Sequence, residues 1–128
     1  MIILDSDVAI DVLRGLAPAV TWFGSCPQDE VVIIPGYVAM EVIWGTRDAR
    51  DQRETERWLA QFQMVWLEPE LCHRAYQTLV AVHLRNAIDT LDLLVAQVAM
   101  SLDRPLCTFN QKHFDVVPGL KTIRPYRR

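Results

Sequence analysis

The sequence lacks the residue patterns from which disulfide frameworks and zinc sites are built. Its three cysteines, Cys26, Cys72 and Cys107, are an odd number with no C-x-x-C pair, and no two of its three histidines stand at a metal-ligand spacing. Free thiols are typical of a reducing compartment, so we expect a cytoplasmic protein in which Cys107, inside PLCTF, is a small buried residue. No arrangement in the sequence supports a serine or cysteine catalytic triad.

The chain also lacks long apolar runs and an excess of basic charge. No apolar stretch is long enough to span a membrane, and the first residues lack the basic segment of a signal peptide. A net charge of −3 and a pI near 5.5 argue against a general electrostatic grip on nucleic acid. The 128 residues contain no repeat, linker or low-complexity stretch, so we expect a single domain over 1–128.

Short apolar runs alternate with longer amphipathic segments along the whole chain. In one of these segments Thr55, Trp58, Leu59 and Phe62 form a stripe with helical spacing. Because strands that alternate with helices are typical of parallel sheets, the pattern predicts an α/β fold of three layers, α/β/α, with a mainly parallel central sheet of four or five strands. Strands are expected at 2–4, 31–34, 64–67, 105–109 and 121–125, and helices at 7–14, 36–45, 48–62, 70–85 and 90–103.

Carboxylate and amide side chains follow several of these strands or begin helices beside them. Asp5 directly follows the first strand, Glu41 lies in the helix after the second, Asp92 opens the helix before the fourth, and Asn110 follows the fourth. Ligands of open parallel sheets bind beyond the carboxyl ends of the strands. We therefore expect these side chains to meet at one edge of the sheet.

Each acid has a structural alternative that the sequence leaves open. Asp89 and Asp92 could both serve the start of a helix, Asp89 as its N-cap and Asp92 in its first turn. Glu41 could pair with Arg14 or Arg47. The better interpretation of Asp7 and of Asp11 is helix charge on a solvated face.

Taken together, the acids indicate a hard metal ion. Neighbouring carboxylates repel each other unless a cation lies among them. Oxygen ligands select Mg²⁺, with Mn²⁺ as a substitute, and hydrolysis of a phosphodiester is the chemistry that such a site supports.

Four motifs resemble those of one enzyme family in their order and spacing. They are MIILDSDVAIDVLRG, IIPGYVAMEVIWG, LDLLVAQVAM and LCTFNQKHF. The chain is similar over nearly its whole length to the PIN-domain ribonucleases, and among them to the VapC-type toxins of bacterial toxin–antitoxin pairs.

The resemblance implies a PIN-like fold, a metal site and partners. Asp5, Glu41 and Asp92 match the metal-binding acids, Asn110 the fourth catalytic position, and Ser6 the hydroxyl residue that orients the site. The chain departs from the family pattern at Asp7, where Asn is usual, at Asn110, which carries no charge for a second metal, and at Phe109, where Arg is frequent. The implied cofactor is Mg²⁺, and the implied partners are RNA, a small VapB-like antitoxin and a second copy of the chain in a homodimer. The residues nominated for RNA contact are Arg14, Lys112, Arg124, Arg127 and Arg128.

Two other functions remain open at this point. ILDSDV is a D-x-D after a strand, as in haloacid-dehalogenase-like phosphatases, where Asp5 would be the nucleophile and Asp7 the general acid. That fold needs a late acidic pair, and this chain offers Asn110 and an isolated Asp115. A receiver-type signalling domain, which is not an enzyme, needs an acceptor Asp at the end of its third strand, where this chain has Glu68 and Pro69.

Overall fold

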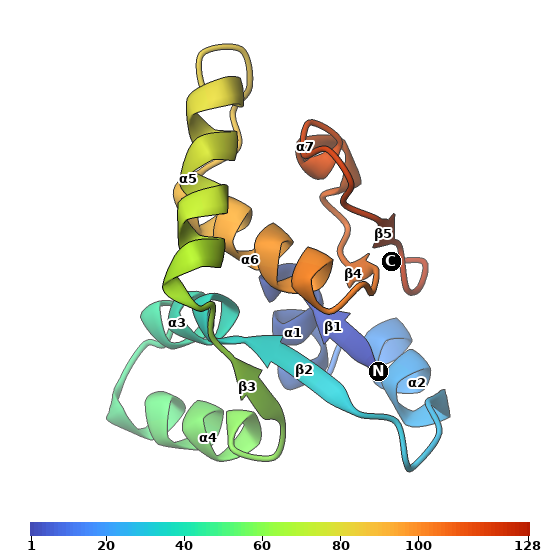
Figure 1. Cartoon of the computed structure of the whole chain (residues 1–128). Helices are drawn as coiled ribbons and strands as arrows, with labels where there is room; N and C mark the ends of the chain where they lie inside the picture. The colour runs from blue at the N-terminus through green and yellow to red at the C-terminus, as the bar shows by residue number, and fades with distance from the viewer.

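The computed structural model describes residues 1–128 and shows a five-stranded sheet with helices on both faces (Figure 1). All strands are parallel, in the order β3-β2-β1-β4-β5. The strands are β1 (Ile2–Leu4), β2 (Val32–Pro35), β3 (Gln63–Val65), β4 (Leu106–Cys107) and β5 (Thr122–Ile123). The helices are α1 (Ser6–Leu13), α2 (Ala17–Ser25), α3 (Gly36–Trp44), α4 (Ala49–Leu59), α5 (Pro69–Val82), α6 (Thr90–Ser101) and α7 (Gln111–Phe114).

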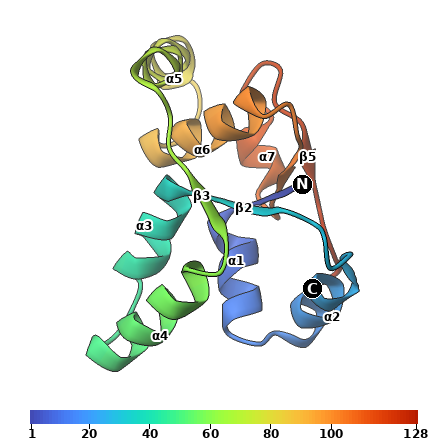
Figure 2. The ribbon, with the colours of Figure 1, turned by 60° about the horizontal axis from the view of Figure 1, so that its bottom comes forward.

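The helices form two layers, which are separated in Figure 2. Helices α1 to α4 lie on one side of the sheet, and α5 and α6 lie on the other. Parallel neighbours need crossover connections, and the helices that make these connections cover both faces. The predicted three-layer α/β fold with a parallel sheet is confirmed.

Strand β1 lies at the centre of the sheet, and its side chains form part of the hydrophobic core. Ile3 pairs with Ile33 of β2 on one side and with Leu106 of β4 on the other, and all three side chains are buried. Cys107 is also buried, as expected for a small apolar residue, and all three cysteines are free thiols. Because β1 and β4 end side by side, Asp5 and Thr108 emerge at the same edge. No helix of the protein is both long enough and apolar enough to cross a membrane.

The structure adds two helices to the expected elements and shortens two of the expected strands. Helix α2 was not expected, because residues 17–25 have no clear division into a polar and an apolar face; Pro18 stands in its first turn, where the missing N–H is tolerated. The short helix α7 was also missed. The last two strands are shorter than expected, with only two residues each in β4 and β5.

Candidate active site

Asp5 is held rigidly where the central strand passes into α1. It is the N-cap of α1, its Oδ1 accepts a hydrogen bond from the Ser6 N–H (2.8 Å), and its Oδ2 accepts one from the Thr108 hydroxyl (2.8 Å). Only 4% of the residue is exposed. Burial, followed by the charge of Asp7, raises the pKa of Asp5 to about 7 in spite of these two hydrogen bonds. The fold therefore fixes a carboxylate whose ionisation it disfavours.

Asp7 connects α1 to the segment after β4. Its Oδ1 accepts a hydrogen bond from the Val8 N–H (2.7 Å), and its Oδ2 accepts one from the Phe109 N–H (2.9 Å). Burial raises its pKa, although these hydrogen bonds and the Arg128 charge oppose the shift. The interpretation of Asp7 as a solvated helix charge is therefore wrong, because its carboxylate bridges two segments of the chain.

Glu41 lacks the arginine partner that the sequence left open. No ion pair of the structure includes it, and Arg47 pairs instead with Asp51. One carboxylate oxygen, Oε1, is buried and has no hydrogen-bond partner. Burial raises the pKa of Glu41, the Ser6 hydroxyl opposes this, and the nearby charge of Asp92 adds to it. An orphaned buried carboxylate oxygen is costly unless a cation or a donor reaches it.

Asp92 lies in the first turn of α6, with Asp89 as the N-cap. The Asp89 side chain accepts a hydrogen bond from the Asp92 N–H (2.9 Å), so the capping interpretation of Asp89 is confirmed. Burial is the largest cause that raises the pKa of Asp92, and the charge of Asp89 is the next; His113 opposes both. The N-terminal end of a helix favours negative charge. The pKa of Asp92 is nevertheless raised, which favours the neutral form of its side chain.

His113, which we did not select from the sequence, lies beside Asp92. Its Nδ1 is 3.2 Å from Asp92 Oδ2 and 2.8 Å from the side-chain amide nitrogen of Asn110. Nδ1 cannot accept from the amide and donate to Asp92 at once, so the proton on this nitrogen decides which contact forms. Asn110 is exposed and reaches the acids through this histidine. The signal in the sequence was only that Asn110 and His113 are three residues apart.

Thr108 was also missed, because its role depends on a contact between distant residues. It is completely buried, it donates to Asp5, and its hydroxyl accepts a hydrogen bond from the Asn110 N–H (3.0 Å). Thr108 thereby fixes Asp5 and the turn that carries Asn110 with one side chain.

The carboxylates act on one another electrostatically, which shows that the fold brings them together. Asp92 raises the pKa of Asp5 and of Glu41, and Asp7 raises those of Asp5, Glu41 and Asp92. As the side chains stand, no group of three or more Asp, Glu, His or Cys residues could hold a metal ion. Mg²⁺ usually keeps several waters and takes only one or two carboxylates directly. The all-oxygen donor set and the orphaned Glu41 Oε1 fit such an ion.

The residues nominated for RNA contact fall in two regions. Arg14 is the C-cap of α1 and lines a polar groove of about 650 Å³ with Arg47 and Asp51. Lys112 and Arg127 are exposed and make no ion pair. Arg124 and Arg128 both lie over the ring of Phe109.

Asp11 does not lie on a solvated face, so that interpretation is wrong as well. Only 16% of its side chain is exposed, and its Oδ2 accepts hydrogen bonds from the Tyr126 hydroxyl (2.8 Å) and from Arg128 Nε (2.9 Å). The C-terminal segment is therefore fastened to α1.

Comparisons with known proteins show the family and the fold of this chain. The PIN domain family matches residues 2–120. Ribonuclease VapC10 of Mycobacterium tuberculosis is 34% identical over 122 residues, which are 94% of this chain and 91% of that protein. Two solved structures share the fold: a toxin–antitoxin complex from Klebsiella pneumoniae (TM-score 0.77, 22% identity, 100% of both chains) and VapBC2 from Rickettsia felis bound to a promoter DNA fragment (TM-score 0.78, 19% identity, 96% of this chain and 98% of that one).

These matches decide between the functions that the sequence left open. A family match over nearly the whole chain excludes the phosphatase and the receiver-type domain, and it confirms the resemblance that the four motifs carry. The chain belongs to the PIN-domain family, among its VapC-type ribonucleases.

Proposed function

We propose that residues 1–128 form a single nuclease domain, a Mg²⁺-dependent endoribonuclease that hydrolyses RNA phosphodiester bonds as the toxin of a type II toxin–antitoxin pair. The observation that carries the metal and the site is the group of Asp5, Glu41 and Asp92, whose pKa values are raised by burial and by neighbouring acids. No cation of the protein neutralises Asp5 or Glu41. A divalent ion is the partner that such a group lacks.

Asp5, Asp92 and Glu41 would hold the ion, directly or through water, and Mn²⁺ could replace Mg²⁺. When bound, the ion would polarise the scissile phosphate and acidify the attacking water. Asp5 is fixed for this role by Thr108 and the Ser6 N–H, and the buried Glu41 Oε1 has no hydrogen-bond partner in the protein, so an ion or its water would satisfy it. Asn110, at the fourth catalytic position, adds a neutral oxygen donor only, and Ser6 and Asp7 support the site.

The RNA backbone would be held by basic side chains, because the protein is acidic overall. Single-stranded or looped RNA can bring its backbone to a surface edge of this kind. The candidates for this contact are Arg14, Lys112, Arg124, Arg127 and Arg128.

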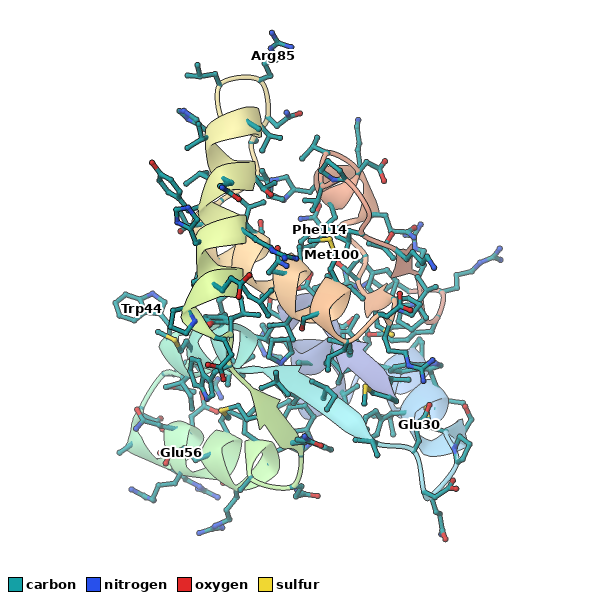
Figure 3. The ribbon with its side chains drawn as sticks, in the orientation of Figure 1. Glu30, Trp44, Glu56, Arg85, Met100 and Phe114 are labelled. Atoms are coloured by element: carbon teal, nitrogen blue, oxygen red, sulfur yellow. The ribbon has the colours of Figure 1, made fainter.

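We further propose that the protein forms a homodimer and binds a small VapB-like antitoxin in the cytoplasm. Several solved structures that share the fold contain a toxin together with its antitoxin. Exposed apolar side chains support protein partners: Trp44 is 91% exposed and projects outward from α3 (Figure 3), and Trp66 joins it along a groove of about 780 Å³ between α3, α4 and β3. Large exposed apolar patches are typical of protein interfaces.

The decisive experiment is cleavage of total cellular RNA by the purified protein with Mg²⁺, with Mn²⁺ and with EDTA. We expect cutting with either metal, none with EDTA, and none by Asp5→Asn. Asp29→Asn is the matched control, because it removes one exposed carboxylate far along the chain from the site. Cleavage by Asp5→Asn at the rate of Asp29→Asn would overturn the assignment.

A further inference from the structure

The C-terminal segment is folded against α1 by a specific set of contacts. Tyr126 and Arg128 both donate to Asp11 Oδ2, and the Tyr126 ring packs at 5.6 Å on Trp22 and at 4.8 Å on Phe109. Side chains that hold one geometry lose their entropy before a ligand arrives. Tyr126 and the guanidinium group of Arg128 are therefore held in a defined arrangement.

Two guanidinium groups, those of Arg124 and Arg128, lie over the ring of Phe109. The Cζ atom of Arg128 is 4.2 Å from the centre of the Phe109 ring and that of Arg124 is 5.3 Å away, both within the range of cation–π attraction. A guanidinium held on a ring face still presents N–H donors at its edge. Arg124 makes no ion pair, and Arg128 uses only Nε for Asp11. Both side chains thus have donors free for a further anion.

This pair of arginines lies next to the acid cluster. The Phe109 N–H donates to Asp7, and Thr108, the preceding residue, donates to Asp5. The positive charge of Arg128 is close enough to Asp7 to lower its pKa, against the effect of burial. An anion bound by the two arginines would therefore lie beside the carboxylates, on the side of the C-terminal segment.

We propose that Arg124 and Arg128, held on Phe109, form a phosphate-binding subsite for the RNA backbone beside the bond that is cut. The inference rests on the proposed nuclease function. Two forked guanidinium groups match the geometry of a phosphodiester, whose oxygens accept parallel N–H donors. Asp11 offsets much of the charge of Arg128, so Arg124 supplies most of the net attraction.

The test measures binding of a fluorescein-labelled single-stranded RNA by anisotropy across a KCl series with Mg²⁺. Asp5→Asn is the parent protein, so that the RNA is bound without being cut. Adding Arg124→Gln should weaken binding about tenfold and should reduce the slope of log affinity against log salt by about 0.7. Adding Arg128→Gln should change both quantities in the same direction but by less, because Asp11 already offsets part of the Arg128 charge. Arg85→Gln is the matched control, since it removes the same charge in the turn that follows α5 (Figure 3) and should change neither quantity.

Two further variants separate phosphate contact from a merely structural role. Arg124 makes no hydrogen bond or ion pair, so Arg124→Gln should leave the thermal midpoint unchanged while it weakens RNA binding. Phe109→Leu keeps both charges but removes the ring, so it should lower affinity with little change in the salt slope. Arg128→Lys keeps the positive charge, so it should have the same salt slope as the parent protein. Its affinity should stay below that of the parent, because an ammonium group cannot make the forked contact.

The outcomes distinguish the subsite from the function on which it rests. A parent that binds RNA, and whose Arg124→Gln and Arg128→Gln variants bind equally well with an unchanged slope, overturns the subsite alone. Wild-type protein that does not cut RNA with Mg²⁺, together with a parent that does not bind it, overturns both. If RNA binding is weakened only in those arginine variants whose thermal midpoint also falls, the arginines have a structural role and the subsite is rejected.

Discussion

Two aspartates at opposite ends of helix α1 have different surroundings: Asp11 has a positively charged partner, and Asp5 has none. Asp11, toward its C-terminal end, accepts from Tyr126 and forms an ion pair with Arg128. Asp5, at its start, is more deeply buried, accepts only from uncharged donors and faces other acids. Asp11, which is paired with an arginine of the same chain, holds two segments together. Asp5, which lies among other acids, has no such partner, and a bound metal ion would supply the missing positive charge.

Asp7 lies between these two environments and shows that they are connected. Its carboxylate receives the Phe109 N–H, while Arg128 lowers its pKa and Asp11 raises it. The acid cluster and the C-terminal segment therefore meet at Phe109. If the contrast between the two regions is correct, changes in the cluster should act on catalysis, and changes at Asp11 should act on stability.

The largest effect is expected from Asp92→Asn, which keeps the shape of the side chain and removes one charge of the cluster. Cleavage by the purified enzyme, as kcat/KM on a defined RNA, should fall by at least about a hundredfold, because the variant lacks a proposed metal ligand. Asp103→Asn, another exposed acid near α6, is the control and should retain full activity. Full activity of Asp92→Asn in pure protein would remove Asp92 from the site.

A large effect on stability is expected from pH in the metal-free protein. The pKa of Asp5 is 3.8 in the unfolded chain and about 7 when folded, so the folded state binds the proton more tightly. The contribution of Asp5 to stability is then fully present below pH 4, declines as the pH rises toward 7, and is absent above that pH. The loss is on the order of 3–4 kcal/mol for a shift of about three units.

Urea unfolding in EDTA at pH 5 and pH 8 measures this decline. Asp5→Asn should bring the two curves closer together and should be the more stable protein at pH 8, because residue 5 can no longer ionise. The raised pKa values of Asp7, Glu41 and Asp92 account for the difference that remains. Mg²⁺ should restore the wild type at pH 8 if the ion binds the ionised cluster. Equal stability of metal-free wild type at both pH values would show that Asp5 is not held near neutrality.

The sequence identified the cluster because its main members are placed by local rules. Asp5 follows a buried strand directly, and Asp92 follows a capping aspartate by three residues, so a parallel sheet brings both to one edge. Glu41 lies close enough to Asp92 and Asp7 for their charges to raise its pKa, and its buried apolar neighbours Val38 and Val42 are the local signal for this placement. Its role as a metal ligand stays a prediction.

The remaining parts depend on contacts between residues far apart in the chain, which no local pattern encodes. Thr108 meets Asp5 across 103 positions, and Tyr126 meets Asp11 across 115. A basic end such as LKTIRPYRR is equally compatible with a solvated tail, and only the partner on α1 decides otherwise. Helix α2 was missed for a different reason, since it is apolar on most sides and has no periodic face.

A smaller effect on activity is expected from Asn110→Ala. Asn110 carries no charge and contacts His113 rather than the carboxylates, so its loss removes one neutral contact at the rim of the cluster. We expect kcat/KM to fall about tenfold or less, with unchanged metal dependence. Activity as low as that of Asp92→Asn would show that Asn110 binds the ion itself, and that the cluster extends beyond the three acids.

The smallest effect is expected from Tyr126→Phe, which removes a single hydroxyl from the fastening of the C-terminal segment. Burial, followed by the hydrogen bond to Asp11, raises the pKa of Tyr126 above its ordinary value, so the phenol keeps its proton at any working pH and donates throughout. Losing this donor should lower the free energy of unfolding by about 1 kcal/mol, while the ring stays on Phe109 and the Arg128 ion pair remains.

Tyr76→Phe, on the exposed face of α5, is the control and should be neutral. Hydrogen exchange should be faster at residues 124–128 in Tyr126→Phe and unchanged in β1. A variant with normal stability but a large loss of cleavage would place Tyr126 in catalysis and would remove the distinction between the two ends of α1.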